Sequence, residues 1–214
     1  MKNLIPNLPA LDVLDLSSVG YFLENKSLRL FVNTVNWAEY AYKPIVVVDV
    51  ARTDKNLYLR YFVKGYSLKA TYGQDGSPVF RDSCVEFFVQ PPRGPYKYMN
   101  FEFNCIGTCD ASYRQSREEK TGLTPQEYAS IRRYPSFEAK PFDEKTGIYS
   151  WELIVAIPFE LMGITPKRLP EKIRANFYKC ADDTQYPHFL SWAPIDLPEP
   201  DFHCPDFFGD LYFR

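Results

Sequence analysis

Residues 81–104 have the sequence RDSCVEFFVQPPRGPYKYMNFEFN, and two runs within this segment show the period-two alternation of β-strands. In the first run, DSCVEFFV, valine and phenylalanine side chains fall on one face and Glu86 falls on the other. In the second run, NFEFN, Glu102 and Asn104 lie opposite two phenylalanines. The prolines between the runs favour a turn. We therefore expect a hairpin that gathers Glu86, Glu102 and Asn104 on one accessible face, with the phenylalanines directed into a core.

Strand patterns continue on both sides of this hairpin. We expect strands at 46–51, 57–63, 83–89, 99–106, 150–157, 173–180 and 210–213. Helical signals are short: a capping box with proline at the first helical position begins at Thr124, and a single turn ends at Gly163. The chain shows neither alternating strands and long helices nor an internal repeat. The sequence therefore predicts an all-β, two-sheet β-sandwich or jelly roll with one or two short helices, formed by residues 1–214 as one domain.

Composition and charge exclude several classes of function. The 214 residues carry a formal net charge of −2, and the basic residues are spread along the chain. We therefore expect neither nucleic acid nor a membrane surface as partner. No run of 18 apolar residues is present. Prolines at 6 and 9 and acids at 12 and 15 interrupt the apolar region that a secretion signal requires. This favours a cytoplasmic chain, although a chain whose leader had been removed would have the same sequence.

The five cysteines are an odd number and include three in strand-like segments. In a chain of this length they are expected to be free thiols rather than a disulfide framework. Cys105 and Cys109 have no second cysteine pair, and both histidines lie far along the chain, so a structural zinc site at this pair is not expected.

Five segments, in order and spacing, carry a resemblance to a known family. They are VNWAEYAYKPIVVVDVARTDKNLYLRYFVKG, PVFRDSCVEFFV, YMNFEFNCIGT, YSWELIVAIPFELMGI and SWAPIDLPEPDFHCPDFFGDLYF. Together they resemble family 9 carbohydrate-binding modules over roughly residues 33–214. The resemblance implies a β-sandwich related to DOMON-like folds, which bind sugars or, in some branches, haem. It implies no enzymatic activity.

The resemblance also implies a ligand site. Family modules that bind sugar ends clamp the ring between two tryptophans, and this chain has Phe80 and Phe202 in those regions. Glu86 matches the family's sugar-contacting glutamate, and Glu102 stands where sugar-binding members have arginine. The prolines around Phe202 predict a fixed loop whose ring contributes more to binding than to folding. The candidate ligand-binding residues are Phe80, Arg81, Glu86, Glu102, Asn104, Trp192, Phe202 and His203.

We therefore expect a non-catalytic module that binds a mono- or oligosaccharide through a polar and aromatic face. Two alternatives remain open at this point. Glu86 and Glu102 on neighbouring strands could serve as the two carboxylates of a retaining glycoside hydrolase. A haem-binding DOMON-like domain would need an axial ligand, for which Met99 and His203 are the candidates.

No cofactor is expected beyond one weakly held structural calcium ion at most. Family members often carry calcium, which requires a dense cluster of oxygen ligands. Four aspartates lie in expected loops without forming such a run: Asp54, Asp75, Asp182 and Asp183.

Overall fold

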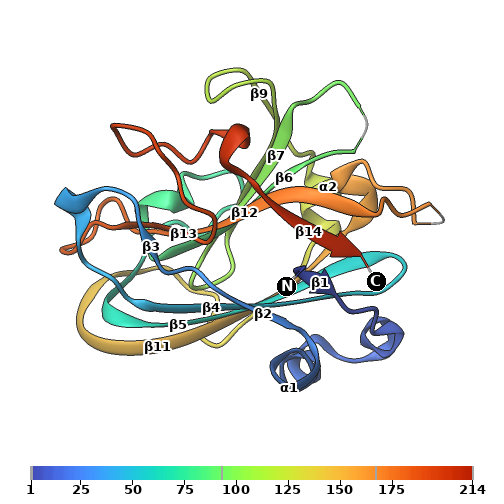
Figure 1. Ribbon diagram of the computed structural model, residues 1–214. Coiled ribbons are helices and arrows are strands. Elements are labelled where there is room, and N and C mark those ends of the chain that lie inside the picture. Colours follow the sequence, from blue (N-terminus) through green and yellow to red (C-terminus); the bar gives the residue numbers. More distant parts are fainter. Residues whose placement is uncertain (1, 93, 167, 214) are drawn as a thin grey trace.

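The computed structural model describes residues 2–92, 94–166 and 168–213, which form a sandwich of two β-sheets (Figure 1). The larger sheet contains, in spatial order, β1 (Leu4–Ile5), β14 (Gly209–Phe213), β12 (Lys172–Cys180), β6 (Cys84–Gln90), β7 (Tyr98–Asn104), β8 (Cys109–Arg114) and β9 (Lys120–Gly122), with β13 (Phe189–Ser191) and β3 (Thr34–Val35) attached beside β12. The smaller sheet contains β10 (Arg132–Pro135), β11 (Phe142–Pro158), β5 (Asn56–Ala70), β4 (Ile45–Arg52) and β2 (Leu28–Phe31). The predicted all-β sandwich is confirmed.

Each of the seven predicted strands coincides with an observed one. They correspond to β4, β5, β6, β7, β11, β12 and β14. The two central strands of the smaller sheet are longer than predicted, because β5 continues to Ala70 and β11 already begins at Phe142. The strands that the sequence did not predict are short or lie at sheet edges, except β8. The hairpin of β6 and β7 is antiparallel, as expected.

The core lies between the sheets and is built from the apolar faces of both. Phe87 of β6 stacks on Phe101 of β7 and on Phe177 of β12, with ring centroids 6.2 and 5.1 Å apart. Trp151 of β11 is buried in the same cluster. Because side chains alternate along a strand, the polar residues of β6 and β7 are placed on the outer face of the larger sheet.

The predicted helical turns are also present. Helix α2 (Pro125–Ser130) begins with a complete capping box between Thr124 and Glu127. A 3-10 turn at Phe159–Met162 ends at Gly163, whose φ of +64° lies in the left-handed region that glycine adopts without strain. Other 3-10 turns are Pro9–Val13, Ala38–Tyr40, Val79–Arg81 and Pro205–Phe207. Among the described residues, no helix has the length and apolarity needed to cross a membrane.

Helix α1 (Leu16–Lys26) was not predicted. It lies against the outer face of the smaller sheet, on the side away from the larger sheet (Figure 1). Val19 and Leu23 pack against Tyr58 of β5 and Ile154 of β11 in a separate apolar cluster. These side chains alternate with the core residues of the same strands, so β5 and β11 bury both of their faces where α1 covers them.

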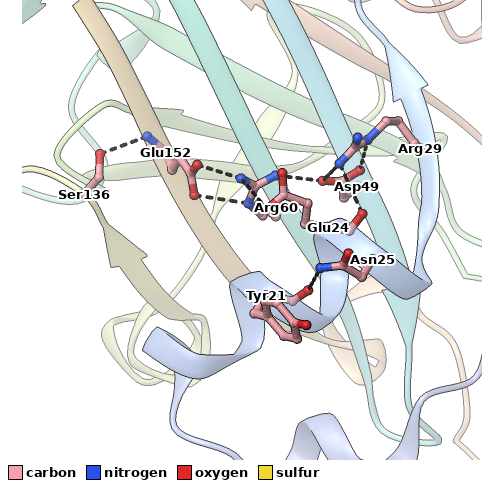
Figure 2. A network of polar contacts seen from close by, with 8 residues as sticks. All are labelled: Tyr21, Glu24, Asn25, Arg29, Asp49, Arg60, Ser136 and Glu152. Carbon is pink, nitrogen blue, oxygen red and sulfur yellow. Dashed lines mark hydrogen bonds and ion pairs between the residues drawn. The ribbon is translucent and has the colours of Figure 1, made fainter.

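A polar network beside this apolar contact connects four strands of the smaller sheet, β2, β4, β5 and β11 (Figure 2). The Arg60 guanidinium donates to both carboxylate oxygens of Glu152, at 3.1 and 2.6 Å, and to Oδ2 of Asp49, at 2.9 Å. Arg29 donates to both oxygens of Asp49, at 2.8 and 3.1 Å. Glu24 of α1 lies 3.6 Å from Arg60. The buried Asp49 carboxylate is therefore paired with two arginines, and α1 covers the network.

Candidate functional site

The register of the larger sheet places three acidic side chains in one row on its outer face. Glu86 of β6 pairs directly with Glu102 of β7, and Glu102 pairs with Asp110 of β8. Residues paired in this way lie about 5 Å apart at Cβ. The predicted common face for Glu86 and Glu102 is confirmed, and β8 adds a third carboxyl group to it.

The loop between β13 and β14 covers part of this face, and Figure 1 shows it beside the larger sheet, outside the sandwich. It is held there by Phe202, whose ring stacks on Tyr178 of β12 with centroids 4.1 Å apart and planes within 6°. The Tyr178 hydroxyl also donates to the carbonyl oxygen of Phe202 at 3.2 Å. A pocket of about 470 Å³ remains between the loop and the acidic row.

The pocket combines aromatic rings with charged groups. Its rings belong to Tyr40, Phe80, Phe189 and Phe202, and its polar side chains include Glu86, Glu102, Asp110, Arg114, Arg117, Lys120, Asp182, Asp201 and His203. Phe189 forms an edge-to-face contact with Tyr40, at 4.7 Å between centroids, and contacts Phe202 at 6.1 Å. Tyr40, Phe80 and Phe189 are partly exposed, so each presents ring surface to a ligand.

The two glutamates are buried, which corrects the expectation that they lie on an accessible surface. Glu86 is 2% exposed and Glu102 is 4% exposed. Oε1 of Glu86 accepts from the Cys180 thiol at 3.0 Å, and Oε1 of Glu102 accepts from the Asn100 amide at 2.9 Å. Oε2 of Glu102 is buried without a hydrogen-bond partner. Residues 199–203 of the loop line the same pocket as both carboxyl groups and come from a distant part of the chain.

Burial changes the charge of this pair. Desolvation raises the pKa of Glu86 to about 8, and the nearby Asp182 adds to the shift. Desolvation also raises the pKa of Glu102 well above its ordinary value, with further contributions from Glu86 and Asp110. Burial therefore favours the protonated form of both carboxyl groups, and in that form each can donate a hydrogen bond as well as accept one.

Basic groups flank the acidic row. Arg114 is buried on β8 and donates to Oδ1 of Asn100. At the rim, Nη1 of Arg117 lies 3.8 Å from Oδ1 of Asp201, and Nζ of Lys120 lies 3.9 Å from Oδ2 of Asp110. The basic side chains of both pairs are about half-exposed, so they can exchange partners when a ligand binds.

His203 also lines the pocket, as predicted. Its Nδ1 lies 3.1 Å from the Tyr98 hydroxyl, with which it shares a hydrogen bond. Burial lowers the pKa of His203 to about 3, and Arg114, Arg117 and Lys120 lower it further. The imidazole is therefore neutral at physiological pH, with one ring nitrogen already engaged by the tyrosine.

Two predicted residues at the start of β6 lie together. Phe80 lines the pocket, and the Arg81 guanidinium lies 5.8 Å from the centre of its ring. Nε of Arg81 is 3.8 Å from the Asp183 carboxylate. Arg81 does not line the pocket itself, and it contacts the pocket only through Phe80.

Asn104 shares the outer face with the glutamates, but its polar atoms are used within the fold. Its amide donates to Oδ2 of Asp82 at 3.0 Å and to the carbonyl of Tyr72 at 2.8 Å, and its Oδ1 accepts from the amide of Thr108 at 3.0 Å. The Asp82 carboxylate also accepts from the backbone amides of Thr71 and Tyr72. Asn104 is completely buried and lies outside the pocket, so the structure gives it a structural role.

Trp192 is placed on the core side of the larger sheet and does not line the pocket. Its ring contacts Phe177 at 5.9 Å between centroids and packs against Gly209, where an added Cβ would lie 2.7 Å from the ring. Trp192 directly follows β13 and points to the same side of the sheet as the buried Leu190, two residues earlier.

Phe202 is in the pocket wall, but it is also part of the fold. It is 8% exposed and belongs to a buried cluster that includes Trp37 and Tyr178. The expectation that its ring contributes little to folding is wrong, because the proline-containing loop is anchored by burying this side chain.

Sequence reasoning missed several pocket residues. Tyr40 and Phe189 were hidden among many other aromatic residues, and Arg114 lies on β8, which was not predicted. The run CDASYR does alternate, with Asp110 and Arg114 on the side opposite the buried Ala111. Its small and polar residues are weak strand formers, so this signal was faint.

All five cysteines are free, as predicted. Two of them, Cys84 and Cys180, lie beside Glu86 beneath the pocket. The four aspartates considered for calcium do not form a cluster of oxygen ligands. Asp75 is paired with Arg133 at 2.6 Å, and Asp54 lies 3.5 Å from Arg52. Asp182 and Asp183 are adjacent in sequence, with Asp183 beside Arg81.

Comparison with solved structures identifies close and distant relatives of this fold. A crystal structure from Bacteroides uniformis, provisionally described as a carbohydrate-binding protein, is 35% identical, with a TM-score of 0.90 over 99% of this chain and 98% of that chain. Two structures of a family 9 carbohydrate-binding module from Caldicellulosiruptor kristjanssonii, in complex with glucose and with cellotriose, have TM-scores of 0.53 and 0.55. Their sequence identities to this chain are 11% and 8%. The alignments cover 100% of this chain and 96% and 94% of the two module chains. These two modules share the fold of this chain.

No protein with curated functional information matches the chain significantly. The sequence profile of Carbohydrate-binding family 9 matches residues 19–213, which is nearly the whole chain. Modules of this family are typically non-catalytic carbohydrate-binding domains. The extent of this match and the similarity to the Bacteroides structure show that the chain belongs to carbohydrate-binding family 9.

Proposed function

We propose that this chain is a non-catalytic carbohydrate-binding module and that the pocket on the outer face of the larger sheet is its ligand site. The observation that carries the proposal is the composition of the pocket, in which partly exposed aromatic rings surround a row of buried carboxyl groups. Its volume of about 470 Å³ lies within the range of roughly 300–1,000 Å³ for small-ligand sites.

The two kinds of side chain would contribute differently to binding. Tyr40, Phe80 and Phe189 offer ring faces on which the CH groups of a pyranose can stack. Glu86 and Glu102, being protonated, can each donate to one sugar oxygen and accept from another hydroxyl. The unpartnered Oε2 of Glu102 would gain a hydrogen bond when a ligand hydroxyl or a water reaches it.

The charge state of the glutamates supports binding rather than hydrolysis. A retaining glycosidase needs one ionised carboxylate as nucleophile beside a protonated acid. Here burial raises the pKa of both groups, which disfavours the ionised nucleophile that such an enzyme requires. Haem binding has no supporting observation: Met99 is buried in the core between the sheets, whereas His203 lies on the outer face and shares its Nδ1 with Tyr98.

Calorimetric titration with glucose, cellotriose and a panel of other oligosaccharides tests the proposal, beside a hydrolysis assay on the same sugars. We expect saturable binding without product release. Phe80→Ala should weaken binding by roughly tenfold, because one stacking contact is worth about 1 kcal/mol. Phe31→Ala is the matched control, since Phe31 is an exposed ring on the edge strand β2 of the other sheet. Equal affinity in both variants, or no saturable binding to any sugar, would refute the proposed site.

A further inference from the structure

Three potential metal ligands meet beneath the pocket. Cys84 and Glu86 are two residues apart on β6 and therefore point to the same face, and Cys180 of β12 pairs directly with Cys84. The Cys180 sulfur lies 3.0 Å from Oε1 of Glu86, the Cys84 sulfur lies 3.9 Å from the same oxygen, and all three atoms are within 4.8 Å of one another. Among the residues that the structure describes, this is the only such group of three.

These separations fit a tetrahedral metal ion. With metal–sulfur bonds of about 2.3 Å and a metal–oxygen bond of about 2.1 Å, tetrahedral ligands lie roughly 3.5–3.8 Å from each other. The two measured distances bracket that range, so only small side-chain movements are needed. Two sulfur ligands favour zinc over calcium or magnesium, which require oxygen ligands.

A second observation points to a bound group at the same place. Oε2 of Glu102, directly across the strand pair from Glu86, is buried and has no hydrogen-bond partner, although Glu102 lines the pocket. A water or ligand oxygen in the fourth coordination position could accept or donate there, as groups around metal sites commonly do. Cys180 and Glu86 line the pocket as well, so this position has access to the cavity.

We propose that Cys84, Glu86 and Cys180 form a Zn²⁺ site on the floor of the pocket, with the fourth coordination position open toward the cavity. Zinc displaces the two thiol protons and any proton on the carboxyl group, which are released to solvent. The ion with two thiolates and one carboxylate carries a net charge of −1. The buried Arg114 guanidinium favours the ionised form of Glu86 and offsets part of this excess. The site does not depend on the ligand class of the pocket.

Zinc binding is measured on the full, reduced, metal-free chain by competition with a chromogenic chelator, without sugar present. We expect one zinc ion per chain, and with Co²⁺ a near-ultraviolet thiolate-to-cobalt charge-transfer band. Cys84→Ser, Cys180→Ser and Glu86→Gln should each weaken zinc binding by roughly tenfold or more. Cys105→Ser is the matched control, because Cys105 is equally buried and lies outside the three-ligand group.

A second readout does not rely on the substitutions. Both Cys84 and Cys180 are buried, and their alkylation in the unmodified chain should be slower with zinc than in the metal-free state, while the labelling of Cys204 stays unchanged. The proposal is overturned if the reduced chain binds no stoichiometric zinc, if the cobalt complex lacks the thiolate band, or if the control variant loses as much affinity as the others. Air oxidation to a disulfide between Cys84 and Cys180, combined with no zinc uptake by the reduced form, would identify a redox pair instead. Sugar titrations on the metal-free chain separate these outcomes from failure of the carbohydrate proposal.

Discussion

Glu86 has two thiols, a second carboxyl group and the residue Tyr178 as neighbours, and almost no contact with water. The protonated form of a carboxyl group is favoured in such surroundings because the charged form loses its hydration. This residue therefore contributes to the stability of the fold in a way that depends on pH.

The direction of that dependence follows from the two states. The pKa of Glu86 is about 8 in the folded chain, against an ordinary value of 4.5. At a pH below 4.5, Glu86 is protonated in both the folded and the unfolded chain and does not affect stability. As the pH rises toward 8, Glu86 ionises only in the unfolded chain, so the folded state loses stability. In the metal-free state, the parent chain should lose at least about 1 kcal/mol more stability than Glu86→Gln between about pH 5 and about pH 8, as measured by urea denaturation. Glu160→Gln, at an exposed position, should follow the parent curve.

Phe202 shows how a pocket residue can also hold the fold together. Its stacking on Tyr178 and its burial predict that Phe202→Ala lowers the free energy of unfolding by about 3 kcal/mol, since a buried aromatic ring is lost and a cavity is left. Phe80→Ala should cost clearly less, because Phe80 is partly exposed. Chemical denaturation of both variants checks this order, and equal losses would contradict it.

At this scale the sequence predicted which face a side chain occupies, but not what covers that face. Alternation along β6 and β7 was sufficient to place Glu86 and Glu102 together. The pocket that they line is also lined by Phe202, 100 or more residues later in the chain, and no local pattern contains that arrangement. Asn104 likewise has the right direction for a ligand contact but uses its amide on Asp82.

At the scale of elements, the strength of the local signal decided which ones were predicted. The capping box at Thr124 identifies α2 from four residues. Helix α1 has no side-chain cap and buries only Val19, Gly20 and Leu23, so its sequence, LSSVGYFLENK, lacks a wide apolar stripe. Its position depends instead on the polar network and on the apolar patch that β5 and β11 present.

That network should be important for stability despite lying outside the core. Replacing Arg60 with leucine removes the partner of Glu152 and one of the two arginine partners of the buried Asp49 (Figure 2). We expect Arg60→Leu to lower the free energy of unfolding by about 3 kcal/mol, because a buried carboxylate loses compensating charge.

Lys140→Leu provides the control for this experiment. Lys140 pairs with Glu138 at 2.5 Å, but both side chains are more than 70% exposed. Such a pair contributes less than about 1 kcal/mol. Urea denaturation of the two variants compares a buried arginine with an exposed lysine, and similar small losses would show that the Arg60 network does not stabilise the sheet.

For the whole molecule, period-two alternation and the absence of long helices were enough to predict the sandwich, because they specify one buried face per strand. They did not predict the second apolar cluster, which lies on the outer face of the larger sheet and includes Trp37, Phe88 and Phe202. The pocket lies over this cluster. Formation of the pocket therefore depends on packing of the loop between β13 and β14 against the outer face of the larger sheet.

The last prediction asks whether this outer cluster folds with the rest of the chain. Trp37 is buried in the outer cluster and donates its indole N–H to the carbonyl of Leu197 at 2.8 Å, whereas Trp151 is buried in the main core. Phe88 on β6 belongs to the outer cluster, and Phe87 beside it belongs to the core. The same strand therefore contributes side chains to both clusters. We expect one cooperative transition, as for a single domain.

Two variants that each retain one of these reporters test this expectation. Replacing Trp151 and Trp192 with phenylalanine leaves Trp37, and replacing Trp37 and Trp192 leaves Trp151. Within each variant, the urea midpoint from tryptophan fluorescence should equal the midpoint from far-ultraviolet circular dichroism, whatever the loss of stability caused by the substitutions. An earlier fluorescence transition confined to the variant that retains Trp37 would mean that the loop and its pocket open while the sandwich remains folded, because local opening then has a lower free energy than global unfolding.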